Sequence, residues 1–267
     1  MNRKTKTKSA RMSYRERKRK NARKTMRRRI FLIFSCFIIA SALFLGFSFL
    51  FKIVFKINNI YVEGNTKYDD KEIINLSGIS VEDNLCFANT SKAENEIYKT
   101  LPYVESVKIK KKLPKRVRIG VEIAAPQFAV RAQEGYLITS KSGKILETAG
   151  ELPTELVGIN GAKYSVGENG IKINYENPSV LSALNEISNA FKTNVLNNIK
   201  EIDVEDFENI VVNYDNRIKI IIGKYEDIDY KVLTAREILN NKIGPSEKGS
   251  LDLRSLKNNN RSYFTPA

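Results

Sequence analysis

The sequence predicts an α+β protein with one membrane-spanning helix, followed by a region of short strands and short helices. Two observations support this prediction. Residues 30–51 form an uncharged apolar run, IFLIFSCFIIASALFLGFSFLF, which is long enough to be a transmembrane helix. From residue 55 onward the apolar residues instead recur in short segments separated by Gly, Pro, Asn and Asp, as is typical of strands and short helices joined by turns.

The apolar run has the length of a bilayer core. Its 22 residues form a helix of roughly 33 Å, against about 30 Å for the hydrocarbon layer. A cleaved signal peptide is the alternative, but its apolar run is usually about 7–15 residues long and ends in small residues. Here the run continues into KIVFK at residues 52–56, which offers no such cleavage site. We therefore predict an uncleaved transmembrane helix over residues 30–54.

The first 29 residues are strongly basic, with 15 Lys or Arg and one acid, Glu16. The chain holds 45 basic and 30 acidic residues, so residues 30–267 hold 30 and 29 and are almost neutral. Because positive flanks stay in the cytoplasm, we predict a disordered cytoplasmic tail over residues 1–29 and an extracytoplasmic C-terminus. Nucleic-acid binding is the alternative for a basic run, but one aromatic residue and an adjoining anchor favour contact with anionic lipid.

The segment 55–125 predicts a small β-α-α-β-β unit. Its helices are expected to end at Gly78 and before Pro102, and the first strand at the turn signal Gly64-Asn65. The predicted elements are, in order, a strand over residues 57–62, helices over 71–76 and 91–100, and strands over 103–111 and 116–123. The alternating apolar residues of the last strand predict a sheet with one buried face, covered by the two helices.

This segment, placed directly behind a basic tail and one anchor, resembles the FtsQ/DivIB family of bacterial cell-division proteins. The residues that carry the resemblance are Val62, Gly64, Asn65, Leu101, Pro102, Val104, Val107, Leu113, Pro114, Val117, Ile119, Val121, Glu122 and Pro126. The resemblance implies that residues 55–125 are a POTRA domain and that residues 126–258 are the family's β domain. It also implies a single-pass membrane protein of the division septum.

Residues 126–258 predict a larger mixed α/β domain whose last strand lies at a sheet edge. Asp215-Asn216 reads as a tight turn between two strands, and Asn177-Pro178 as the start of a helix of about 14 residues. The predicted strands cover residues 135–138, 143–146, 155–159, 199–204, 209–214, 217–222 and 251–254, with a second helix over 230–241 and a glycine-rich loop up to residue 170. Residues 259–267 are expected to be a C-terminal strand or tail.

Residue types needed for most catalytic sites are missing. The chain has no His, which excludes a Ser-His-Asp triad, a Cys-His pair and a histidine-based zinc site. Its two cysteines, Cys36 in the membrane helix and Cys86 outside, cannot pair, and we expect Cys86 to be buried as a small apolar side chain. An intermolecular bridge through Cys86 is the alternative.

One acidic cluster could serve a glycosidase as paired carboxylates. Because it lies between two predicted strands, a solvated loop is the favoured interpretation. The cluster consists of Asp203, Glu205, Asp206 and Glu208. We therefore predict no enzymatic activity, no cofactor and no metal.

Partner binding is the remaining function. The resemblance implies that the C-terminal strands bind two small bitopic coiled-coil division proteins of the FtsL and FtsB/DivIC type, and so act indirectly on the septal peptidoglycan synthase complex. Open sheet edges recruit partners by β-augmentation, and aromatic residues dominate binding hot spots. The alternative is a C-terminal segment that only closes the core. The corresponding residues are Leu251, Asp252, Leu253, Arg254, Tyr263 and Phe264.

A basic hairpin forms a second candidate surface, for the membrane or for an anionic wall polymer. The alternative is a charged strand face that prevents edge pairing. Its residues are Lys108, Lys110, Lys111, Lys112, Lys115, Arg116 and Arg118.

Three other functions remain open as alternatives to a division role. The chain could be a wall-polymer-binding scaffold or a sporulation-type extracytoplasmic scaffold of similar architecture. POTRA domains also occur in outer-membrane assembly factors, but the sequence has no series of amphipathic strands of about ten residues that would build their barrel.

Overall fold

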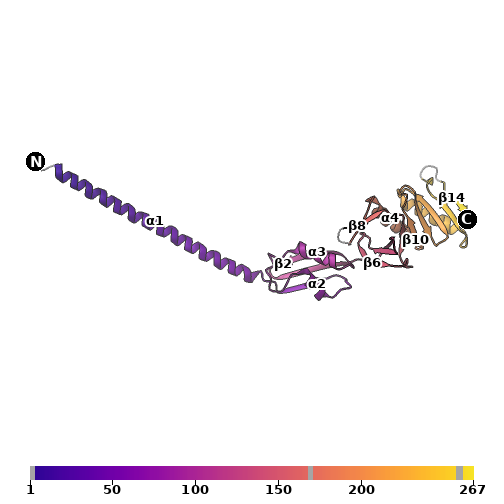
Figure 1. Ribbon diagram of the computed structural model, residues 1–267, viewed down its shortest axis with the longest axis horizontal. Helices are drawn as coiled ribbons and strands as arrows, with labels where there is room; N and C mark the ends of the chain where they lie inside the picture. Colours follow the sequence, from indigo (N-terminus) through magenta and orange to yellow (C-terminus); the bar gives the residue numbers. More distant parts are fainter. Residues whose placement is uncertain (1–3, 168–170, 257–260) are drawn as a thin grey trace.

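The computed structural model describes residues 4–167, 171–256 and 261–267. A long N-terminal helix leads into a three-stranded sheet, and a nine-stranded sheet follows, so that the two termini lie at opposite ends of an elongated molecule (Figure 1). The predicted α+β class, with one apolar helix followed by a small and a larger unit, is confirmed.

Helix α1 runs from Lys4 to Val54. Among the residues that the structure describes, one helical segment is long and apolar enough to cross a membrane, Ile30–Val54. The basic tail was expected to be disordered, but its backbone is helical from Lys4 onward. Lys and Arg are good helix formers, and the apolar helix behind them removes the cost of starting a new helix.

The three-stranded sheet has the predicted β-α-α-β-β order. Strand β3 lies in the middle, parallel to β1 and antiparallel to β2, while helices α2 and α3 cover one face. Helix α2 ends at Gly78, which takes the left-handed conformation, and the Asn89 side chain caps α3 by accepting a hydrogen bond from the Lys92 amide. The elements are β1 Asn59–Glu63, α2 Asp70–Ser77, α3 Thr90–Thr100, β2 Val104–Lys112 and β3 Arg116–Ile123.

The nine-stranded sheet has the strand order β14-β13-β12-β11-β10-β7-β4-β5-β6. Its strands are β4 Phe128–Arg131, β5 Tyr136–Thr139, β6 Ile145–Ala149, β7 Val157–Asn160, β10 Ile199–Asp203, β11 Ile210–Tyr214, β12 Ile218–Gly223, β13 Gly249–Asp252 and β14 Tyr263–Pro266. Asp215 and Asn216 both have positive φ angles, 57° and 52°, and form the predicted tight turn between β11 and β12. Strands β14 and β6 are the two edges.

Three strands were not predicted. Strand β4 lies in a segment without turn signals, while β8 Tyr164–Val166 and β9 Ile173–Tyr175 pair with each other on either side of the expected glycine-rich loop. These strands are only three or four residues long, too short for an alternating pattern to be recognised.

Helices α4 Ser179–Thr193 and α5 Ile228–Asn241 pack against each other and on one face of the large sheet. The Asn177 side chain accepts a hydrogen bond from the Ser179 amide and so starts α4. The apolar stripe of α4, including Leu184, Ile187 and Phe191, is fully buried in this core. This core supports the C-terminal strands β12 and β13.

A buried lysine joins the two sheets. Lys144, in the turn between β5 and β6, is 0% exposed, and its ammonium group donates to the main-chain carbonyls of Tyr98, Leu101 and Val104 at 2.7, 2.8 and 2.6 Å. These carbonyls lie at the end of α3 and the start of β2 in the small sheet unit. The ammonium also lies 4.0 Å from the centre of the Tyr98 ring.

Burial disfavours the charged form of this lysine. Desolvation lowers the pKa of Lys144 from its usual 10.5 to about 8, and the negative charge of Glu105 opposes this shift. A pKa of about 8 leaves most of the Lys144 side chains protonated at neutral pH. The ammonium therefore connects the two units at neutral pH.

We predict that Lys144→Met lowers the free energy of unfolding of the full chain in detergent by at least about 2 kcal/mol, because buried carbonyls lose their donor. The effect depends on pH. Between about pH 8 and 10.5 the unfolded chain holds a proton on Lys144 that the folded chain has lost, so the stability of the native chain relative to the variant rises with pH over this window.

Chemical denaturation of both proteins from pH 7 to pH 11 measures this difference. Lys144→Arg serves as the control, because a guanidinium stays charged throughout and removes the pH-dependent part. A stability difference between native chain and Lys144→Met that does not change with pH would contradict the assigned pKa.

Candidate functional site

The C-terminal strand β14 is the outermost strand at one edge of the large sheet (Figure 1). It runs antiparallel to β13, with Tyr263 opposite Asp252 and Phe264 opposite Leu251. The strand lies at the end of the molecule farthest from the membrane helix. A strand or a tail was expected for this segment, and the structure has a strand over Tyr263–Pro266.

The main-chain N–H and C=O groups of Phe264 point away from β13, toward the open side of the edge strand. The Ala267 amide donates to the Lys248 carbonyl, and the Gly249 and Leu253 amides donate to carbonyls next to or within β12. Because hydrogen-bonding direction alternates along a strand, Tyr263 and Thr265 bond to β13, and the N–H and C=O of Phe264 point outward. These groups form an open edge at which another strand can pair.

A glycine lets β14 approach the sheet. A Cβ atom at Gly249 would collide with the carbonyl oxygen of Thr265 and would lie 3.0 Å from the Phe264 ring. The pairing of β14 with β13 therefore requires glycine at this position. The φ angle of Gly249 is not among the positive ones, so close approach alone accounts for this requirement.

The six predicted partner-binding residues occupy three different environments. Leu251 and Leu253 are fully buried in the core of the large unit, so their side chains cannot contact a partner. Strand β13 is an inner strand, covered by β14, and its apolar residues point toward α4 and α5. The edge itself belongs to β14.

Asp252 and Arg254 form a surface ion pair. The Arg254 Nη2 lies 2.6 Å from a carboxylate oxygen of Asp252, and the Arg254 Nε donates to both oxygens. The hydrogen bonds and charge of the guanidinium lower the pKa of Asp252, and the carboxylate raises that of Arg254. An exposed pair of this kind adds little stability.

Tyr263 and Phe264 point to opposite faces of the sheet. Tyr263 is 52% exposed, whereas Phe264 is partly buried and packs against the core. Tyr263 is thus the aromatic side chain that a partner can contact directly, while Phe264 holds the edge strand in place.

The predicted basic residues lie on the hairpin formed by β2 and β3. The register places Lys110 opposite Arg118 and Lys112 opposite Arg116 on one face of the small sheet. Arg118 pairs with Glu63 of β1 at 2.8 Å, and the Lys111 ammonium donates to the Cys86 carbonyl at 3.0 Å. Lys108 lies on β2, and Lys115 lies in the turn between β2 and β3.

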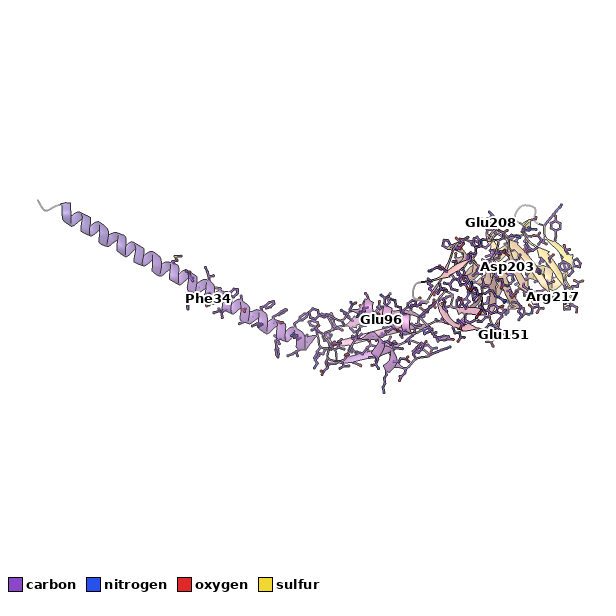
Figure 2. All side chains as sticks on the ribbon, in the orientation of Figure 1. Phe34, Glu96, Glu151, Asp203, Glu208 and Arg217 are labelled. Carbon is purple, nitrogen blue, oxygen red and sulfur yellow. The ribbon has the colours of Figure 1, made fainter. Side chains whose placement is uncertain are left out.

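The acidic cluster has the geometry of a turn. Asp203 and Asp206 accept hydrogen bonds from the Glu205 and Glu208 amides, and Glu208 pairs with Lys224 at 2.6 Å. These carboxylates are exposed at the surface (Figure 2). Within the described ranges, no group of three or more His, Cys, Asp or Glu side chains is arranged to hold a metal ion.

Cys86 is exposed and not buried as expected. Its amide is held in a turn by the Asn84 side chain, which directs the thiol away from the core of the small unit. The cysteine prediction failed because residue type was the only available signal, and local turn geometry decided the outcome.

Comparison with known proteins supports the assignment of the small sheet unit as a POTRA domain. Residues 55–122 match the family model described as "POTRA domain, FtsQ-type". The chain contains an FtsQ-type POTRA domain. This match covers the three-stranded sheet and its two helices.

Similar whole proteins extend the match into the large sheet. The chain is 28% identical to the cell division protein DivIB of Clostridium botulinum strain Hall over 202 residues, covering 74% of this chain and 78% of the relative. It is also 28% identical to DivIB of Clostridium acetobutylicum, covering 77% and 81% of the two chains. With the cell division protein FtsQ of Corynebacterium glutamicum the identity is 24%, covering 70% and 79%. The resemblance to the FtsQ/DivIB family is confirmed.

Sequence reasoning missed three residues that shape these surfaces. Lys144 and Gly249 act through contacts with segments distant in sequence, and no local pattern marks such contacts. Phe87 stands in a polar loop, and no local pattern indicates its contact with Phe51 of the membrane helix.

We predict that Gly249→Ala detaches β14 from β13 while leaving the rest of the sheet folded. The added methyl group collides with the main chain of β14, which holds only four residues. Hydrogen exchange at the Thr265 amide should become at least tenfold faster. The neighbouring variant Ser250→Ala is the matched control, and it should exchange at the native rate. Unchanged protection at Thr265 in Gly249→Ala would contradict the assigned packing.

Proposed function

We propose that this protein is a non-enzymatic component of the bacterial division machinery. It binds small bitopic division proteins of the FtsL and FtsB/DivIC type outside the membrane and helps to assemble and regulate septal peptidoglycan synthesis. The observation that carries this proposal is the open edge of β14, with the Phe264 N–H and C=O facing outward and Tyr263 exposed beside them.

The proposed division role is based on the names of the similar proteins. The similar proteins of known name are cell division proteins, and their similarity covers about three quarters of this chain. The chain has no His, and its acidic cluster around Asp203 and Glu205 forms hydrogen bonds within a turn. Few side chains are therefore available for catalysis. Binding through an edge strand needs no reactive group, because main-chain hydrogen bonds supply affinity and side chains choose the partner.

The proposed topology follows from charge. The basic residues before Ile30 stay in the cytoplasm, which directs both sheets to the outer side of the membrane. Residues 126–258 act as the partner-binding domain and residues 259–267 provide its edge strand. The protein then concentrates at the division septum because its partners do.

Co-purification tests the edge as the docking site. Full-length protein in detergent should retain the FtsL-type and FtsB/DivIC-type proteins of the same organism. Tyr263→Ala should weaken this binding by roughly 30-fold, which corresponds to the ~2 kcal/mol of a hot-spot residue. Gly249→Ala should also weaken it, although it changes no residue that contacts the partner, because it removes the edge strand.

Tyr230→Ala is the matched control for this experiment. Tyr230 is a tyrosine of similar exposure on α5, away from the sheet edge. Equal retention of the partners by the native chain, Tyr263→Ala and Gly249→Ala would place the docking site elsewhere on the protein. Loss of binding in Tyr230→Ala alone would assign it to the α5 surface.

A further inference from the structure

The membrane helix continues into the POTRA domain without a free linker. The Phe55 amide bonds back to the Phe51 carbonyl, and the Phe55 carbonyl accepts a hydrogen bond from the Leu85 amide at 2.8 Å. Two residues further on, the Ile57 amide donates to the Asp83 carbonyl at 2.8 Å. The loop around residues 83–87 is therefore held against the end of the span, and its distance from the membrane is fixed.

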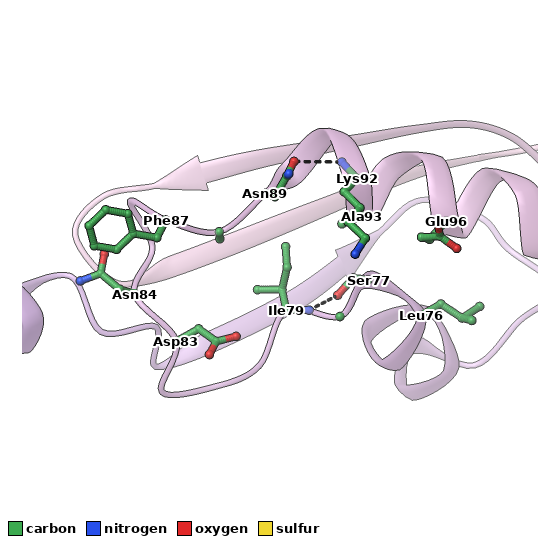
Figure 3. A pocket seen from close by; sticks show the side chains of 12 residues that line it. Leu76, Ser77, Ile79, Asp83, Asn84, Phe87, Asn89, Lys92, Ala93 and Glu96 are labelled. Carbon is green, nitrogen blue, oxygen red and sulfur yellow. Dashed lines mark hydrogen bonds between the residues drawn. The ribbon is translucent and has the colours of Figure 1, made fainter.

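This loop carries an exposed aromatic side chain, Phe87, next to the end of the membrane-spanning helix. Phe87 is 79% exposed, and its ring centre lies 6.4 Å from that of Phe51, which belongs to the membrane-spanning segment. Figure 3 shows Phe87 and Asn84 at the end of the domain where the chain enters from the membrane helix. A ring in contact with a residue of the span lies at the depth of the membrane interface.

The tip of the basic hairpin lies at the same end. Asn59, at the start of β1, pairs with Arg116, at the start of β3, and the Asn58 amide donates to the Lys115 carbonyl at 2.8 Å. The hydrogen bond from the Lys111 ammonium to the Cys86 carbonyl connects the hairpin to the Phe87 loop. Leu113, in the turn of this hairpin, is 69% exposed.

Most of the positive charge of the hairpin has no acidic partner among the residues that the structure describes. Lys112 stands opposite Arg116 and Lys110 opposite Arg118, and like charges directly opposite each other destabilise a sheet. Among the described residues, Arg118 pairs with Glu63, whereas Lys110, Lys112 and Arg116 have no acidic side chain within ion-pair distance. An anionic surface next to the hairpin would relieve this repulsion.

We propose that this end of the POTRA domain rests on the anionic phospholipid surface of the membrane that the chain's own helix spans. Phe87 and Leu113 enter the interfacial layer. The ammonium and guanidinium groups around the hairpin turn contact lipid phosphates. The contributing basic residues are Lys110, Lys111, Lys112, Lys115 and Arg116.

The position of the hairpin tip beside the membrane-spanning helix favours phospholipid over a wall polymer as its anionic partner. Each strand residue advances roughly 3.3 Å, so the residues nearest the turn lie within about one Debye length of the surface. Two exposed apolar side chains beside the basic groups suit a layer with both acyl chains and phosphates. Contact at two points beside the helix also fixes the tilt of the elongated molecule, and hence the height of the β14 edge above the membrane.

Depth-dependent fluorescence quenching tests this placement. The chain contains no Trp, so Phe87→Trp and Leu113→Trp each give the full-length protein a single indole. The probes are vesicles of brominated phosphatidylglycerol or brominated phosphatidylcholine. Leu233→Trp, on α5 of the distant unit, is the matched control. We expect quenching at positions 87 and 113 in phosphatidylglycerol several-fold stronger than at 233.

Charge neutralisation completes the test. We expect the triple variant Lys111→Gln, Lys112→Gln, Lys115→Gln, combined with Leu113→Trp, to reduce quenching at position 113 to the level at position 233. Replacing brominated phosphatidylglycerol by brominated phosphatidylcholine should reduce the quenching at position 113 in the same way. Quenching at 113 equal to that at 233 in both lipids would overturn the proposal. Binding of purified cell wall by the native hairpin, lost in the triple variant, together with no quenching at 113, would assign the surface to wall polymer instead.

Discussion

The buried ammonium of Lys144 is the contact on which the arrangement of the molecule depends. It fills its hydrogen-bonding capacity with three carbonyls from the end of α3 and the start of β2. A charge removed from water is tolerated only where its partners are fixed in place. One side chain of the large unit is therefore anchored on the small unit at the junction between them.

Much of this architecture could be predicted from local patterns. The length of the uncharged run predicted the anchor, the turn signals predicted the β-α-α-β-β order, and Asp215-Asn216 predicted its hairpin, because each depends on neighbouring residues. The assignment of Leu251 and Leu253 to the binding surface did not allow for β14 covering β13. Which strand forms the edge depends on pairing between distant segments, and that information is not present in any short stretch.

The same limit applies to the key contacts. Lys144 follows a glycine in a hairpin turn, where a lysine is ordinarily exposed, and its burial results from a neighbouring domain. Gly249 looks like one loop glycine among others until the closeness of β14 is known. Packing between segments, more than residue type, determines the role of both.

Functionally, the molecule has two open surfaces at opposite ends. The hairpin tip and Phe87 lie beside the end of the apolar helix, and the β14 edge lies at the far end of the large sheet (Figure 1). A rigid connection between these ends would present the edge at a constant height above the membrane. That property suits the proposed docking of small membrane-anchored division proteins at the β14 edge.

The most direct test of the division role is imaging of a fluorescent fusion to the basic N-terminal tail in dividing cells, followed by depletion of the protein. The account predicts a band at midcell and filamentous cells after depletion. A uniform membrane signal, with normal division after depletion, would contradict it.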